Sequence, residues 1–460
     1  MEQFVKILNS IIWSHALIVL CLGVGTYFTI KTRFVQVRFL REMIRLLFKG
    51  KSSGKGVSSF QAFVIALSGR IGVANIAGVA IAIATGGPGA VFWMWLVAFL
   101  GAASACIEST LGQLYKEEID GEYRGGPPFY IAKGIGKKWY ATLFAYITIL
   151  CMAFFLPGIQ SNTMAVGMEN AYGTPVHCTG IIMTGLLALV IFGGVKRIGK
   201  VAEIMVPFMT CIYLVVAFII LAYNVTSLPA MLSLIVRSAF GLEQTLSGLF
   251  GICIISGVRR GIASNGAGMG AGAYMAAAAD AKHPAAQGLI QAFSVYIDTL
   301  IVCTATAFMI LLTGKYNVVN PEGGFMVSNL TGVKAGTAYV QFAVNEYFPS
   351  FGQGFVALSL LFFAFTTLMA FYYIAETNVS YLARKMNRRS IRALRLCFLL
   401  GVLCGSMSST KLIWAIGDIG IGLMAWLNMI ALILLRKPAL NLLQDYIGQR
   451  RTKKEPTFPR

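Results

Sequence analysis

The chain has 460 residues, of which 57% are apolar and only 12% are charged, and its mean hydropathy is +0.73. Soluble domains contain about 25% charged residues, so this composition argues against a soluble enzyme, a disordered chain and, despite a net charge of +20, a nucleic-acid binder. It is typical of an all-α polytopic membrane protein.

Apolar segments long enough to cross a membrane recur along the whole chain. The first is followed, not preceded, by basic residues, so we expect a retained helix and not a cleaved signal peptide. The basic stretch after it contains Lys31, Arg33, Arg38, Arg41, Arg45, Lys49, Lys51 and Lys55. We predict eleven spans, at about 11–30, 58–85, 88–115, 139–166, 177–195, 201–223, 243–279, 287–312, 353–382, 393–409 and 411–435.

The basic residues alternate with these spans in a way that sets their orientation. With the N-terminus outside, the cytoplasmic segments hold 30 Lys and Arg residues and the outside segments hold 5. The positive charge therefore faces anionic membrane lipid and not nucleic acid. We expect a bacterial-type cell membrane, an outside N-terminus, a cytoplasmic C-terminus and a disordered basic tail, Gln449–Arg460.

Two of the predicted spans contain the same unusual pattern. Arg70-Ile-Gly-Val-Ala-Asn-Ile-Ala-Gly78 and Arg260-Gly-Ile-Ala-Ser-Asn-Gly-Ala-Gly268 both read Arg-x4-Asn-x-Ala-Gly. Five spans separate the two starts, so the second copy enters the membrane from the opposite side. This predicts a five-plus-five inverted repeat: an extra helix and basic segment at 1–57, repeats at 58–223 and 224–435, and a basic tail at 436–460.

Gly and Asn in the middle of an apolar span weaken a helix. Irregular backbone at membrane depth is tolerated only where it lines a cavity or is buried in protein. Paired interrupted spans in two halves indicate a transporter binding site, where one half-helix offers N–H groups to an anion and the other offers carbonyls to a cation. The alternative is that the small residues only allow tight helix packing.

Several segments resemble the alanine or glycine:cation symporter family, also called the sodium:alanine symporters. The resemblance extends from about residue 13 to 435. The family implies a leucine-transporter-like architecture of eleven helices and sodium-driven uptake of a small neutral amino acid, alanine or glycine first. The matching segments are 59–79, 86–95, 125–130, 264–270, His283-Pro284, 298–304 and Phe365-Thr-Thr367 with Glu376.

The resemblance, together with the broken-span pattern, nominates two groups of residues. Asn75 and Asn265 are expected to start the inner half-helices, where they act as helix caps, substrate ligands or both. Mid-span threonines bond either to their own helix or to sodium. For substrate we nominate Val73, Ala74, Asn75, Gln160, Asn162, Asn265, Gly266, Gly268 and Phe371, and for sodium Gly69, Gly72, Thr366 and Thr367.

Three positions depart from the pattern that the resemblance implies. Ala74 stands where Gly is usual, Gly266 where Glu is usual, and Phe371 where many members have Trp. A larger neutral amino acid such as glutamine is therefore the alternative substrate. Proton coupling, with Arg70 near the cation site, is the alternative to sodium.

Other functional classes lack support in the sequence. We expect no cofactor apart from the coupling ion, and a functional monomer. A channel or a membrane-embedded enzyme is a remote alternative, since no nucleophile–base or metal-binding motif is found. Ionisable residues in or near spans are expected to be paired structural charges, with a substrate-coupled gate as the alternative. They are Arg70, Glu108, Arg259, Arg260, Asp298, Glu376 and Asp418.

Overall fold

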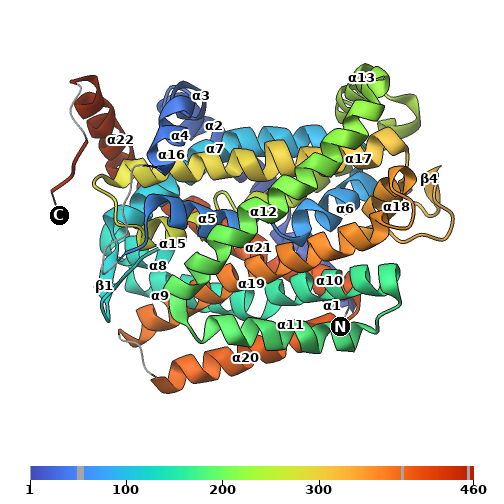
Figure 1. Cartoon of the computed structure of the whole chain (residues 1–460). Coiled ribbons are helices and arrows are strands. Elements are labelled where there is room, and N and C mark those ends of the chain that lie inside the picture. Colours follow the sequence, from blue (N-terminus) through green and yellow to red (C-terminus); the bar gives the residue numbers. More distant parts are fainter. Residues whose placement is uncertain (1, 49–55, 385–387, 453–455, 460) are drawn as a thin grey trace.

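The computed structural model describes residues 2–48, 56–384, 388–452 and 456–459. Three of the predicted basic residues, Lys49, Lys51 and Lys55, lie outside these ranges. The described chain is a bundle of long helices that run roughly side by side, with two small hairpins at opposite ends (Figure 1). We call these the β1 end, which also holds α15 and α22, and the α13 end, which also holds α18.

In the N-terminal half, most predicted spans correspond to one helix or to a pair in series. The helices are α1 (Glu2–Ile12), α2 (His15–Lys31), α3 (Val35–Arg38), α4 (Leu40–Leu47), α5 (Ser59–Arg70), α6 (Ala77–Gly86), α7 (Ala90–Leu114), α8 (Pro127–Tyr130), α9 (Lys138–Leu150), α10 (Leu156–Tyr172), α11 (Val176–Ile191), α12 (Gly194–Tyr223) and α13 (Leu228–Ala239). Strands β1 (Glu117–Ile119) and β2 (Glu122–Arg124) pair antiparallel.

The C-terminal half is also almost entirely helical. Its helices are α14 (Phe250–Asn265), α15 (Ala271–Ala278), α16 (Pro284–Val295), α17 (Thr304–Thr313), α18 (Thr337–Tyr347), α19 (Gly352–Ala383), α20 (Arg388–Ser406), α21 (Thr410–Leu434) and α22 (Arg436–Arg451). Strands β3 (Asn317–Val319) and β4 (Phe325–Ser328) form the second hairpin. A π-helical segment, η6 (Tyr296–Cys303), joins α16 to α17.

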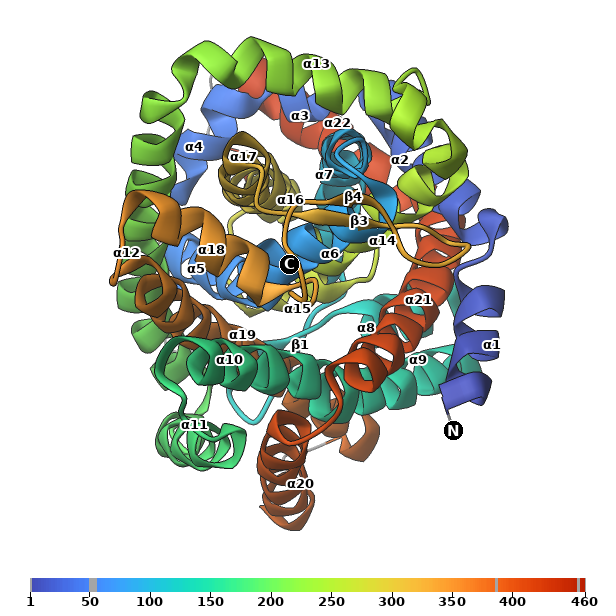
Figure 2. The same cartoon turned by 90° about the vertical axis from the view of Figure 1, so that its right-hand side faces the viewer.

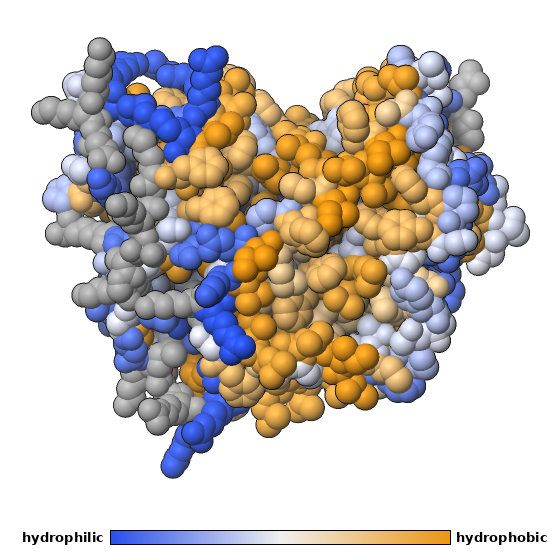
Figure 3. Space-filling view, in the orientation of Figure 1, coloured by the Kyte–Doolittle hydropathy of each residue, from blue (hydrophilic) through white to orange (hydrophobic). Residues whose placement is uncertain are grey.

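In the described part of the chain, 7 helices are long and apolar enough to cross a membrane, or 8 if the bent pair of α5 and the segment 73–86 counts as one span. The predicted segments 177–195, 243–279 and 393–409 fall on α11, on α14 with α15, and on α20. Large apolar side chains cover the middle of the molecule between more polar ends (Figure 3). This is the surface expected of a protein surrounded by lipid.

A capping box starts helix α5, and a closely packed glycine follows its end. Ser58 caps its start, because its hydroxyl accepts the Gln61 N–H while Gln61 Oε1 accepts the Ser58 N–H. The helix stops at Arg70, and the chain resumes as a short 3-10 turn, η1 (Val73–Asn75), and then as α6, bent by 57°. A Cβ on Gly72 would lie 2.7 Å from Thr367 Oγ1 and 3.0 Å from Gln160 Oε1, so only glycine lets α10 and α19 approach the break.

The second broken helix differs from the prediction. Asn265 was expected to begin the inner half-helix, but it ends α14, and α15 starts only at Ala271. Gly266, Gly268 and Gly270 have φ of +61°, +84° and +87°, the left-handed conformation that glycine adopts without strain. Gly266 thus terminates α14 as a left-handed cap. The break follows Arg in the first copy of the motif and Asn in the second.

The C-terminal segment also differs from the prediction. Residues Gln449 to Arg451, expected to be disordered, belong to α22. Glu42 of α4 accepts hydrogen bonds from Tyr446 and Arg450, and the Phe458 N–H donates to Lys282 O at 2.9 Å. The described part of the tail is therefore docked on the β1 end.

The two broken helices lie in the interior of the bundle. Viewed from the α13 end, α5, α6 and α15 are enclosed, and α11, α12, α13 and α20 lie at the periphery (Figure 2). Most residues around both breaks are accordingly buried, and Asn75 and Asn265 have no exposed surface.

Candidate functional site

Oxygen atoms of α5 and α19 converge at the first break. Thr367 Oγ1 lies 2.9 Å from Ser68 O, 3.1 Å from Ile71 O and 2.8 Å from Phe363 O. One hydroxyl proton satisfies only one of these carbonyls. Ser68 O also lacks the helical donor four residues on, because the Gly72 N–H donates to Asn75 Oδ1. These neutral oxygens have the character of a site for a hard monovalent cation.

The two adjacent threonines have different surroundings. Thr366 Oγ1 lies 3.1 Å from Phe362 O and Phe363 O of its own helix and 4.0 Å from Met209 Sδ of α12. Within the described residues, no hydrogen bond joins the Thr366 hydroxyl to α5. Of the residues nominated for sodium, Thr367 and Gly72 thus meet at the break, Gly69 packs against Ala370 of α19, and Thr366 points elsewhere.

The side chains of Gln160 and Asn162 also lie in different parts of the bundle. Gln160 Oε1 accepts the Val73 N–H at 3.1 Å, so it lies at the first break. Asn162 donates to Ser408 O at 2.6 Å and lines a large cavity at the α13 end. Ala74 is partly exposed, whereas Phe371 is buried one helical turn from Thr367.

Asn75 connects the two broken helices through a carboxylate. Its Nδ2 donates to Asp298 Oδ1 at 2.7 Å, and Asp298 Oδ2 accepts hydrogen bonds from Ser264 at 2.9 Å and Thr299 at 2.6 Å. The sequence analysis expected Asp298 to be a paired structural charge and did not nominate Ser264 as a site residue. The signal for Asp298 was its position as a carboxylate inside an apolar span.

The second break is organised around Glu108 of α7. Its Oε2 accepts the N–H groups of Gly268 and Gly270, each at 3.1 Å, and the Asn428 amide at 3.0 Å. Arg70 reaches the same region and donates to Asn265 O. Arg70 and Glu108 both lie beside Gly272, where an added Cβ would meet Arg70 Nη2 at 2.6 Å and Glu108 Oε1 at 3.3 Å. The sequence analysis named Glu108 only as an ionisable residue, although its carboxylate accepts two N–H groups of the break.

A cavity of about 1500 Å³ occupies the α13 end. Its wall includes residues of α1, α6, α10, α14 and α21 and the loop before α18. In the described part of the chain, Asn162 is the one nominated substrate residue that lines it; the others lie deeper, at the breaks. We call it the open cavity.

The whole chain, residues 1–460, matches the model of the sodium:alanine symporter family. The chain belongs to this family. It is 55% identical over 459 residues to the putative sodium/proton-dependent alanine carrier protein YrbD of Bacillus subtilis, covering 100% of this chain and 95% of that protein. It is 50% identical to the sodium/proton-dependent alanine carrier protein of Bacillus sp. (strain PS3), covering 90% and 94%. Identity to the probable sodium/glutamine symporter GlnT of Bacillus subtilis is 42%, covering 100% and 93%.

Solved structures confirm the leucine-transporter-like fold of this symporter family member. MhsT in complex with L-phenylalanine superposes with a TM-score of 0.55 at 13% identity, covering 85% of this chain and 98% of MhsT. A Na+-coupled sialic acid symporter superposes with a TM-score of 0.53 at 12% identity, covering 97% and 92%. The chain is a multi-pass membrane transporter and not an enzyme.

The β1 end of this symporter is closed by buried charges. Arg124 pairs with Glu376 at 3.1 Å and with Glu122 at 3.0 Å, and the Arg124 and Glu376 side chains are 1% and 2% exposed. Burial opposes the charge of Arg124, but Glu376, Tyr373 and Glu122 outweigh it, and the pKa of Arg124 is raised. The β1 end thus contains a buried ion-pair cluster, whereas the open cavity lies at the α13 end.

Proposed function

We propose that this symporter family member carries a small neutral amino acid, alanine or glycine first, into a bacterial cell together with sodium. The observation that carries the proposal is the convergence of the Thr367 hydroxyl with the Ser68 and Ile71 carbonyls. A neutral set of oxygens binds sodium reversibly, because release on the far side must remain possible. The relatives named as alanine carriers support the choice of substrate.

The substrate site that we propose lies between the two breaks. A zwitterion needs donors for its carboxylate and acceptors for its ammonium group, and the ends of interrupted helices supply both. Its residues are Val73, Ala74, Asn75, Gln160, Asn265, Gly266 and Gly268, with Phe371 as a wall and Asn162 at the entrance. We add Asp298 and Ser264, because they join Asn75 to the second broken helix.

We propose eleven spans in a five-plus-five inverted repeat, 58–223 and 224–435, preceded by the segment 1–57 and followed by 436–460. An outside N-terminus and a cytoplasmic C-terminus follow from the distribution of 30 basic residues against 5. The first and last helices begin and end at opposite ends of the bundle (Figure 1), which fits an odd number of crossings. The α13 end is then outside, and the open cavity is its entrance. We propose a monomer as the functional unit.

A larger substrate or a proton as coupling ion is the second candidate. Gly266 and Phe371 are smaller than the Glu and Trp that the family resemblance leads us to expect there, and one relative is named a glutamine symporter. Two relatives are named sodium/proton-dependent, and Glu108 and Asp298 are carboxylates at the breaks.

Uptake by purified protein in vesicles decides between these candidates. Alanine, glycine and glutamine are offered in turn under a sodium gradient or a proton gradient. At 100 mV and a tenfold sodium gradient, the driving force is about 3.7 kcal/mol, or several-hundred-fold accumulation.

Replacing Asn75 with Leu is expected to reduce sodium-driven alanine uptake below detection. The change leaves the Gly72 N–H and Asp298 Oδ1 without their partner, at about 1–3 kcal/mol each, and both groups shape the break. Sodium-driven alanine uptake into vesicles that contain the purified variant measures this loss. Asn224→Leu is the matched control, because Asn224 bonds only at the α13 end, to Ile220 O and Tyr347. Normal uptake by the Asn75 variant would remove the first break from the site.

A further inference from the structure

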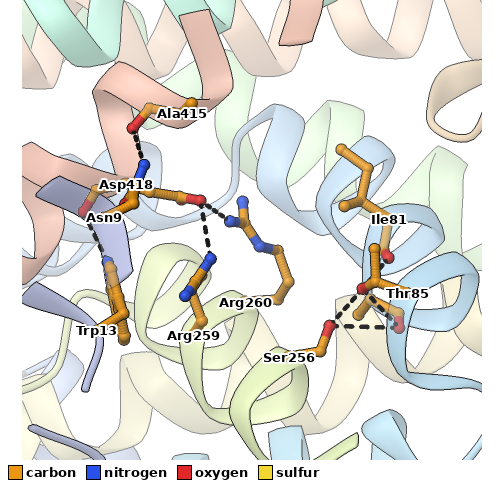
Figure 4. A network of polar contacts seen from close by, with 10 residues as sticks. Asn9, Trp13, Ile81, Thr85, Ser256, Arg259, Arg260, Ala415 and Asp418 are labelled. Carbon is orange, nitrogen blue, oxygen red and sulfur yellow. Dashed lines mark hydrogen bonds and ion pairs between the residues drawn. The ribbon is translucent and has the colours of Figure 1, made fainter. Parts of the chain in front are cut away.

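Two arginines and one aspartate face the open cavity. Arg259 and Arg260 of α14 both approach the same oxygen of Asp418 on α21 (Figure 4). Arg260 Nη2 donates to Oδ2, and Arg259 Nη1 lies 3.7 Å from it. The cluster therefore carries two positive charges against one negative charge.

The partners within the cluster leave bonding capacity unused. Arg260 Nη1, Arg259 Nε and Asp418 Oδ1 are buried atoms without a hydrogen-bond partner. Arg260 and Asp418 are each only 5% exposed, so water solvates them little. A guanidinium group normally binds a carboxylate through two parallel hydrogen bonds. Arg260 makes one, and its second terminal nitrogen is buried without a hydrogen-bond partner.

Aromatic rings contact both arginines without involving the Asp418 carboxylate. The Arg260 guanidinium lies 5.0 Å from the Trp414 ring centre, and that of Arg259 lies 5.1 Å from the Trp13 ring centre. Trp13 Nε1 donates to Asp418 O at 2.8 Å, and Asn9 of α1 donates to Ala415 O at 2.7 Å, so α1 and the residue that follows it are bonded to this part of α21. The positive side of the cluster is thus pre-organised.

The remaining charged side chains around the open cavity are mostly basic. Lys6, Lys334 and Lys411 line it, opposed by Glu169. With the cluster, the wall carries five basic and two acidic side chains. Such an excess raises the local concentration of carboxylate-bearing solutes.

We propose that Arg260, assisted by Arg259, is an outer docking site for the carboxylate of an incoming amino acid, and that Asp418 occupies it in the absence of ligand. The arriving carboxylate replaces Asp418 on Arg260 and releases the contact between α14 and α21. Arg260 precedes Asn265, the last residue of α14, by five positions, about 7.5 Å along the helix. Docking therefore acts one and a half turns before the second break. This inference rests on the proposed function.

The test uses the full-length purified protein and two probes, alanine and propionate, which is a carboxylate without an ammonium group. Both are measured in the Asn75→Leu background, where the deep site is disabled. We expect weak binding of both probes to persist there. Arg260→Gln should abolish it, and Asp418→Asn should strengthen propionate binding at least tenfold, because the internal competitor loses its charge.

The opposite signs separate a docking site from a structural ion pair. If Arg260→Gln and Asp418→Asn both weaken propionate binding, or if the Asn75→Leu protein binds neither probe, the docking site is refuted. Arg260→Lys keeps the charge and is expected to retain propionate binding. If Arg260→Gln fails to fold, the effect of Asp418→Asn on propionate binding still decides.

In the otherwise unchanged protein, Arg260→Gln should raise the KM of alanine uptake about tenfold with kcat nearly unchanged. Wild-type protein that takes up no amino acid would contradict the proposed function, whereas uptake with an unchanged KM in Arg260→Gln would contradict only the docking site.

Discussion

Thr367→Val is expected to raise the sodium concentration needed for half-maximal alanine uptake at least tenfold, whereas Thr366→Val changes it less than twofold. Valine keeps the shape of threonine but removes the hydroxyl. At position 367 this deletes the oxygen that lies 2.9 Å from Ser68 O and 3.1 Å from Ile71 O. A tenfold change corresponds to about 1.4 kcal/mol, within the range for one hydrogen bond or ligand to a charged group.

The neighbouring threonine is a matched control within the same helix turn. Thr366 Oγ1 bonds to carbonyls of its own helix, so its loss costs little at the break. The measurement is sodium-dependent uptake by vesicles containing each variant, with expression and insertion compared directly. Equal effects of both substitutions, or uptake that ignores sodium and follows a proton gradient, would contradict the sodium site at Thr367.

This pair also illustrates what a sequence leaves undetermined. Two adjacent threonines in an apolar span are about 100° apart around the helix. Only the tertiary packing of α19 against α5 and α12 decides which one meets the break. By contrast, Gln160 and Asn162 are two residues apart and therefore about 200° apart, so their separation was predictable from helix geometry.

The two broken spans were predictable in existence but not equally in position. Glycine and asparagine in an apolar run located both interruptions. The shared motif then suggested that Asn75 and Asn265 are equivalent, but alternate glycines at 266, 268 and 270 set the second break after Asn265. Local backbone preference outweighed the motif, because three left-handed residues cannot continue a helix.

The ionisable residues show a different limit. The expectation of paired charges is met by Arg260 with Asp418 and by Glu376, whose partner Arg124 comes from a hairpin that the sequence did not single out. Asp298 instead bonds to an amide and two hydroxyls. A span sequence identifies a costly charge, but its partners lie on other helices and only the assembled bundle reveals them.

Glu108→Ala is expected to destabilise the protein by about 3–5 kcal/mol and to abolish uptake. The carboxylate is fully buried, and its loss leaves the N–H groups of Gly268 and Gly270 without an acceptor. It also removes an acidic group that lies near the buried Arg70. An uncompensated buried charge and two unsatisfied donors act in the same direction.

Thermal unfolding of the purified variants, together with uptake, provides the measurement. Glu346→Ala is the control, because the exposed pair of Glu346 with Lys315 at 2.9 Å contributes at most about 1 kcal/mol.

Glu108→Gln keeps an acceptor oxygen for the two glycines and removes only the charge, so it should fold better than Glu108→Ala. If protons drive transport through this carboxylate, the Gln variant loses the pH dependence of uptake but still binds alanine. If sodium alone drives it, the Gln variant keeps the wild-type pH profile at a lower rate. A Glu108→Ala protein as stable and active as the Glu346→Ala control would show that the second break does not depend on this carboxylate.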